Sequence, residues 1–110
     1  MSITKDGDIY GFTYKDAEFT HIVKYHSFFF RDVDNAYNSF YDMIMKGFEE
    51  MPAEPIKLEL HDQFVWLKFS KQMGIKLVTF TSTIDKSPGS REISSKDFNK
   101  KQIEKLFGKK

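Results

Sequence analysis

The stretch from Asp34 to Met51 constrains the fold more than any other part of the chain. Its apolar residues recur at steps of three and four, which places them along one side of an α-helix, and most of its charged residues fall on the other side. Asp32 or Asp34 can cap the first helical amides, and Pro52 prevents the helix from continuing. A helix of this kind is marginal alone, so its aromatic stripe must pack on an apolar surface that the flanking segments supply. The stripe consists of Tyr37, Phe40, Tyr41, Ile44, Met45, Phe48 and Met51.

The segments on either side of this helix are expected to form strands. On the N-terminal side, residues 9–14 alternate in polarity and residues 19–30 are rich in β-branched and aromatic side chains, which indicates a hairpin. Residues 1–8 are polar and are expected to fray. On the C-terminal side, residues 56–83 predict a three-stranded antiparallel meander, with turns at His61 and Asp62 and at Gly74.

A second helix is expected to begin at Ser94. Ser94 can cap this helix with Asp97 three residues on, Ile93 is placed to contact Phe98, and Gly108 can end it. The order is therefore two strands, a helix, three strands and a helix. It predicts an α+β fold in which two helices pack on one face of an antiparallel sheet, as a single domain over residues 1–110.

Composition limits the classes of function. The chain has no cysteine, which excludes disulfide scaffolds, thiolate metal sites and cysteine nucleophiles. No apolar run approaches the roughly 18 residues that a membrane helix needs, so we expect no membrane association and a cytoplasmic location. Aromatic residues make up 16% of the chain, enough to fill a core and to leave some rings for a surface.

No constellation in the sequence indicates catalysis. His21 and His26 are five residues apart on an expected strand, so they point to opposite faces and cannot share a metal ion unless a bulge intervenes. His61 beside Asp62 is typical of a turn. Neither the dinucleotide-binding nor the P-loop glycine pattern occurs. We therefore expect a protein that is not an enzyme and that has no cofactor and no metal site.

An aromatic sheet face is the first candidate for binding. Phe64, Trp66 and Lys68 alternate along one side of an expected strand, and Phe80 on the next strand is expected beside them. An edge strand ending near Phe28–Phe30 could also supply anchors or pair with a second copy as a homodimer. These features favour a small inhibitor, immunity protein or accessory regulator that docks on another protein through an aromatic sheet face or edge strand with charged rims.

Nucleic-acid binding is the alternative, because charge is distributed unevenly. Residues 1–62 contain 6 basic and 12 acidic residues, whereas residues 63–110 contain 11 basic and 4 acidic residues, so the two parts carry about −6 and +7. A basic C-terminal half can contact phosphates. The residues proposed for this contact are Lys86, Arg91, Lys96, Lys100, Lys101 and Lys105.

Overall fold

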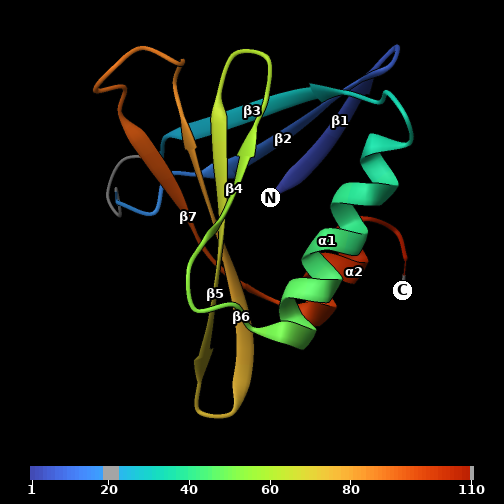
Figure 1. Cartoon of the computed structure of the whole chain (residues 1–110), viewed down its shortest axis with the longest axis vertical. Helices are drawn as coiled ribbons and strands as arrows, with labels where there is room; N and C mark the ends of the chain where they lie inside the picture. Colours follow the sequence, from blue (N-terminus) through green and yellow to red (C-terminus); the bar gives the residue numbers. More distant parts are fainter. Residues whose placement is uncertain (19–22, 110) are drawn as a thin grey trace.

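The computed structural model describes residues 1–18 and 23–109, which form two antiparallel sheets and two helices (Figure 1). The α+β class expected from the sequence is therefore confirmed. The part of the expected strand at residues 19–22 lies outside the described residues. In chain order the elements are β1 Ser2–Asp6, β2 Ile9–Lys15, β3 Tyr25–Arg31, α1 Ala36–Glu50, β4 Ile56–Glu59, β5 Phe64–Gln72, β6 Ile75–Thr83, β7 Glu92–Asn99 and α2 Lys100–Leu106.

The strands divide into two sheets, where the sequence analysis predicted one. One sheet has the order β1-β2-β3 and the other has the order β4-β5-β6-β7, and all pairings are antiparallel. In Figure 1 the strands of the smaller sheet cross those of the larger sheet at a steep angle, and α1 and α2 lie beside each other. Orthogonal packing of this kind lets two short sheets enclose one layer of side chains.

A single cluster of buried side chains connects both sheets and both helices. Phe12 of β2 stacks on Phe28 of β3 with ring centroids 5.1 Å apart, and it meets the edge of Phe40 from α1 at 5.3 Å. Edge-to-face and offset contacts between rings add to the stabilisation from burial. The cluster consists of Phe12, Tyr14, Phe28, Phe40, Ile44, Phe48, Val65, Leu67, Phe69, Val78, Phe80, Ile93, Phe98, Ile103 and Phe107.

Helix α1 begins and ends close to the expected residues. Asn35 precedes it with a φ of 62°, and the Asp32 carboxylate accepts a hydrogen bond of 3.0 Å from the Tyr37 amide. Met51 ends the helix with a φ of 48°, immediately before Pro52. Capping by Asp32 and termination before the proline are therefore confirmed.

The expectation that residues 1–8 fray is wrong. Residues 2–6 form β1, which pairs with β2 so that Asp6 lies opposite Ile9. Gly7 occupies the tight turn between them with a φ of 63°, a conformation that favours glycine. The polar composition of residues 1–8 suggested a frayed end, but β1 is an exposed edge strand and therefore needs few apolar residues.

The expected start of the second helix at Ser94 is also wrong, because this segment is strand β7. The Ser94 hydroxyl bonds to the Thr81 hydroxyl at 2.8 Å, and the Asp97 carboxylate accepts a hydrogen bond from Thr79. These two polar side chains therefore bond across strands instead of capping a helix. The helix begins after Asn99, whose side chain forms a capping box with Gln102.

Candidate protein-binding surfaces

The outer face of β5 carries the aromatic residues that the sequence analysis selected. Val65 and Leu67 are fully buried in the core, so the alternating residues Phe64, Trp66 and Lys68 lie on the opposite face of the sheet. Phe64 and Trp66 are half-buried and their ring centroids are 6.2 Å apart. They form a small aromatic pair on an open sheet face.

Phe80 does not belong to this face, so the prediction that it lies beside Phe64 and Trp66 is wrong. The register of β5 and β6 pairs Phe80 with Leu67, and the exposed fraction of Phe80 is 0%. Its ring contacts Phe28 and Phe98 in the core. Alternation within β6 does not reveal the cross-strand register, and the register decides which face of the neighbouring strand Phe80 shares.

Mixed charge surrounds the aromatic pair. The Lys57 ammonium lies 4.3 Å from the ring centroid of Phe64 and 5.7 Å from that of Trp66. The Lys86 ammonium is 5.4 Å from the Phe64 centroid and 2.9 Å from the Glu59 carboxylate. The Lys86 hydrogen bond lowers the pKa of the Glu59 carboxyl group. Positively and negatively charged side chains therefore surround the aromatic pair, and polar rims of this kind are common at protein interfaces.

Strand β4 forms the open edge of the larger sheet. It pairs with β5 alone, and Leu60 just beyond it donates a main-chain hydrogen bond of 2.8 Å to Gln63 on the β5 side. Because main-chain groups alternate in direction along a strand, the N–H and C=O groups of Lys57 and Glu59 point away from β5. Within residues 1–18 and 23–109, these groups have no main-chain partner on the open side.

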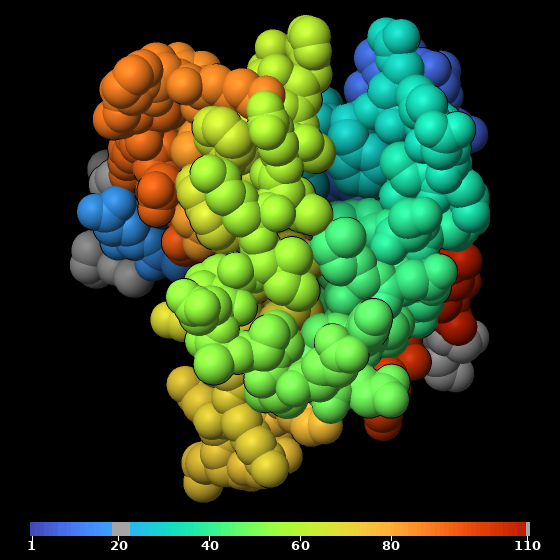
Figure 2. Space-filling model, viewed as in Figure 1, coloured from blue at the N-terminus to red at the C-terminus, as the bar shows by residue number. Residues whose placement is uncertain are grey.

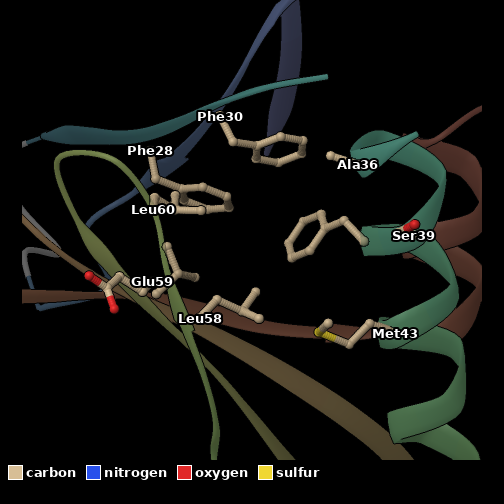
Figure 3. A pocket seen from close by; sticks show the side chains of 10 residues that line it. Phe28, Phe30, Ala36, Ser39, Met43, Leu58, Glu59 and Leu60 are labelled. Carbon is tan, nitrogen blue, oxygen red and sulfur yellow. The ribbon is translucent and has the colours of Figure 1, made fainter. Parts of the chain in front are cut away.

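An apolar cleft lies between β4 and α1. Figure 2 shows the hollow on the front face of the molecule, and Figure 3 shows Leu58 from one side and Met43 from the other pointing toward each other. Its volume is about 220 Å³. Figure 3 also shows the Glu59 side chain directed away from the cleft. The lining residues are Phe28, Phe30, Ala36, Ser39, Phe40, Met43, Leu58, Glu59, Leu60 and Val65.

The edge of β3, by contrast, is closed by a side chain. Gln63 is buried, accepts a hydrogen bond from the Phe29 amide at 3.3 Å and donates to the Ser27 carbonyl oxygen at 3.0 Å. The Arg31 carbonyl oxygen accepts from the Val33 amide at 2.9 Å. The Phe29 N–H group and the Ser27 and Arg31 carbonyl groups are thus occupied, although the Phe29 ring itself is 53% exposed.

No family model matches the chain, and no curated protein or solved structure is significantly similar to it. In the described part of the chain, no helix is long and apolar enough to span a membrane. The same residues contain no group of three or more His, Asp or Glu side chains placed to hold a metal ion.

The six basic residues selected for nucleic-acid binding do not share one hollow or one element. Lys86 pairs with Glu59, and the Arg91 guanidinium lies 3.3 Å from Asp16 and 2.9 Å from Glu18. Lys96 and Lys105 border one hollow, Lys100 borders another, and Lys101 is exposed on α2. Lys96 lies on β7 and not on the C-terminal helix where we expected it, because that segment forms a strand.

The histidines do not form a paired acid–base site in the described residues. His61 Nε2 is 3.7 Å from the Asp62 carboxylate, but both side chains are almost fully exposed. His26, His61 and Asp62 border one hollow, yet the Nε2 atom of His26 has no hydrogen-bond partner among the described residues. Burial lowers the pKa of His26. His21 lies outside the described residues.

The residues of α1 that border the cleft were not predicted as binding residues from the sequence. Met43 and Ser39 lie at the side of the apolar stripe and gave no signal of their own. The alternation of Ile56, Leu58 and Leu60 correctly indicated a half-buried strand. It could not show that the covering helix leaves a space beside that strand.

Proposed function

We propose that this chain is a non-enzymatic binding protein of the inhibitor, immunity or accessory-regulator type, which docks on another protein through the β4 side of the molecule. The observation that carries this proposal is the coincidence of an open strand edge with an apolar cleft on the same strand, β4. Exposed strand edges and apolar hollows are both features that proteins use to bind other proteins.

Both faces of the larger sheet supply anchors along this edge. On the inner face, Leu58 presents an apolar side chain to the cleft. On the outer face, Lys57 covers the Phe64–Trp66 pair, and Lys57 lies directly opposite Trp66 in the strand register. A partner seated on β4 would reach both sets of side chains, and aromatic residues with apolar pockets are the usual anchors of interfaces. Binding there would act by steric occlusion of the partner, with charge assisting the encounter.

Site-specific photo-crosslinking in cells of the native host tests this proposal. A photoreactive side chain at Glu59 is expected to form discrete protein adducts, and the same group at Lys101 on α2 provides the matched control. Adducts at Glu59 should disappear when the cleft is altered by Met43→Lys. Adducts that are absent from Glu59, or identical from both positions, would contradict docking at β4.

Nucleic-acid binding by the basic C-terminal half remains the alternative proposal. It is favoured by Lys96 and Lys105, which border one hollow. Electrostatic binding to phosphates weakens steeply with salt. Replacing Lys100 and Lys101 by Glu should abolish binding to short DNA and RNA duplexes if this alternative holds. Binding that is absent or insensitive to salt argues against it.

A further inference from the structure

We propose that the occupant of the cleft is an extended segment of the partner protein, which adds to the edge of β4 as a fifth strand, inserts one large apolar side chain between β4 and α1, and carries basic residues beside it. This inference rests on the proposed function, since it names the chemistry of the partner that would dock there.

The main chain of β4 favours an extended occupant. The N–H and C=O groups of Lys57 and Glu59 point toward the open side and alternate as the partner groups of an added strand would require. Such a strand lies about 4.8 Å from its neighbour. A helix cannot satisfy these groups because its own main-chain groups bond within the helix. Strand addition to an exposed edge is a recurring way to bind peptides.

The cleft supplies the site for a side chain of that strand. Every second side chain of an added strand faces the inner side of the sheet, where Leu58 and Met43 border the cleft. An apolar cavity of about 150 Å³ holds a benzene-sized group. The cleft of about 220 Å³ is therefore large enough for one Leu, Phe or Met side chain. The lining offers almost no polar atom, so a polar side chain at this position would lose its hydration without compensation.

Charge around the cleft favours a basic partner. The segment from residue 31 to residue 62 borders the cleft on both sides (Figure 2), and it contributes more exposed acidic than basic residues. Its basic side chains are already engaged: Arg31 with Asp8 at 3.6 Å, Lys46 with Glu50 at 3.9 Å and Lys57 with the Phe64 ring. Glu50 and Glu59 are likewise engaged, with Lys46 and Lys86. The other exposed acidic residues of this segment are Asp34, Asp42, Glu49, Glu54 and Asp62.

The same charge argues against a second copy as the occupant. Two copies paired through β4 would bring their acidic segments together, and like charges across an interface are unfavourable. Lys57 and Glu59 could pair with their counterparts in an antiparallel dimer, but they already interact with Phe64 and Lys86 within the chain. A basic segment from a different protein would not be repelled by the acidic residues, and it would not require Lys57 and Glu59 to leave their present partners.

Synthetic peptides provide the probe. Each alternates threonine with leucine or phenylalanine, and each is made with flanking lysines or, as the matched control, with flanking glutamates. Fluorescence anisotropy with the full-length protein is expected to show saturable binding of the lysine-flanked peptides and at least tenfold weaker binding of the glutamate-flanked ones, a difference that shrinks with salt. Equal affinity for both flanks would overturn the charge assignment.

Backbone methylation of the peptide tests strand addition without changing the protein. The N–H groups of an added strand point alternately toward β4 and away from it, so the odd-numbered and the even-numbered peptide residues form two sets. N-methylation of one set removes the N–H groups that face β4, whereas N-methylation of the other set changes only the far edge of the strand. The affinity should fall about tenfold or more for one of the two methylated sets only. An equal loss of affinity for both sets would exclude an added strand.

Variants of the protein locate the site and separate this inference from the proposed function. Leu58→Lys and Met43→Lys should abolish peptide binding, whereas Ile75→Lys, at an exposed apolar position of β6, should leave it intact. Circular dichroism checks that each variant folds. Absence of peptide binding while the Glu59 crosslinks persist would reject the strand model but leave docking at β4 in place. A dimer that Leu58→Lys dissociates would replace the peptide by a second copy.

Discussion

The phenol oxygen of Tyr14 lies 2.6 Å from the Ser82 hydroxyl and 2.6 Å from the Ile93 carbonyl oxygen. Tyr14 belongs to β2 of the smaller sheet, whereas Ser82 and Ile93 belong to β6 and β7 of the larger sheet. One buried hydroxyl group therefore joins the two sheets. Burial raises the pKa of Tyr14 to about 12, so the phenol stays protonated and donates a hydrogen bond over the physiological pH range.

Replacing this hydroxyl group should destabilise the protein although the ring remains. Tyr14→Phe leaves the Ile93 carbonyl oxygen and the Ser82 hydroxyl without this partner in a buried position. We expect the free energy of unfolding to fall by about 1–3 kcal/mol, measured by urea denaturation. Tyr25→Phe on β3 is the matched control, because Tyr25 is 65% exposed and its change should stay within about 0.5 kcal/mol. Equal effects of the two substitutions would contradict the role of Tyr14.

The second prediction concerns Gln63, which bonds to main-chain groups of both sheets. Its amide donates to the carbonyl oxygens of Ser27 and Thr83 at 3.0 and 2.8 Å and accepts from the Phe29 amide. Gln63→Leu should cost about 2 kcal/mol or more and should speed hydrogen exchange at the Phe29 amide. Gln72→Leu, at the exposed end of β5, is the control and should leave that exchange rate unchanged. Unchanged exchange in Gln63→Leu would count against the bridge.

The third prediction concerns Gly47, at which α1 lies against the Phe69 ring of the larger sheet. A methyl group at this position would overlap the ring of Phe69, which packs edge-to-face on Phe48 with centroids 5.5 Å apart. Alanine normally favours a helix by about 1 kcal/mol over glycine. Here Gly47→Ala should instead lower the free energy of unfolding by about 1–3 kcal/mol because of overpacking.

A second substitution shows whether this steric conflict is the cause. Adding Phe69→Leu to Gly47→Ala makes room for the methyl group, so the double variant should be more stable than the sum of the two single changes predicts. Asp42→Ala on the exposed side of α1 is the control and should change stability by less than about 0.5 kcal/mol. Strict additivity of the two core substitutions would refute the explanation.

The fourth prediction is a dependence of stability on pH through His26. Burial lowers the pKa of His26 in the folded protein, and Asp16 opposes this shift while Arg91 adds to it. The unfolded chain binds a proton near pH 6.5, about the ordinary pKa of histidine, whereas the folded protein binds it only at lower pH. The unfolded state therefore holds more protons in this window, and the free energy of unfolding falls as pH decreases below about 6.5.

Urea denaturation at about pH 7.5 and pH 5.5 measures this effect. His26→Asn should reduce the loss of stability between the two pH values relative to the unmodified protein. His61→Asn is the control, because the His61 side chain is 95% exposed and should leave the loss unchanged. A pH dependence that is identical in all three proteins would exclude His26 as its source.

Local patterns predicted those elements whose residues repeat with a clear period. Helix α1 and the strands β4, β5 and β6 were expected close to their observed positions, because burial follows a period of 3.6 in a helix and of 2 in a strand. Within β5, alternation also separated Trp66 on the outer face from Leu67 in the core. These predictions needed no knowledge of which element lies opposite.

The failures occurred where the deciding contact comes from a distant segment. Ser94 and Asp97 have the spacing of a helix cap, but the hydroxyl groups of Thr81 and Thr79 across the sheet bond to them instead. Phe80 was placed with Trp66 because its strand was known and its register was not. The cleft beside β4 was not predicted at all, since it depends on the distance between a strand and a helix that meet only in the folded chain.

Residue order alone was enough to specify an α+β domain with an amphipathic helix and a strand carrying Phe64 and Trp66, because period and polarity are local properties. Tertiary packing determined four further features: the division into two sheets, the burial of Phe80, the strand at residues 92–99 and the open edge at β4. Each of these depends on which main-chain groups and side chains find partners far away in the chain. Such pairings are selected by the energy of the whole fold, and no local pattern contains them.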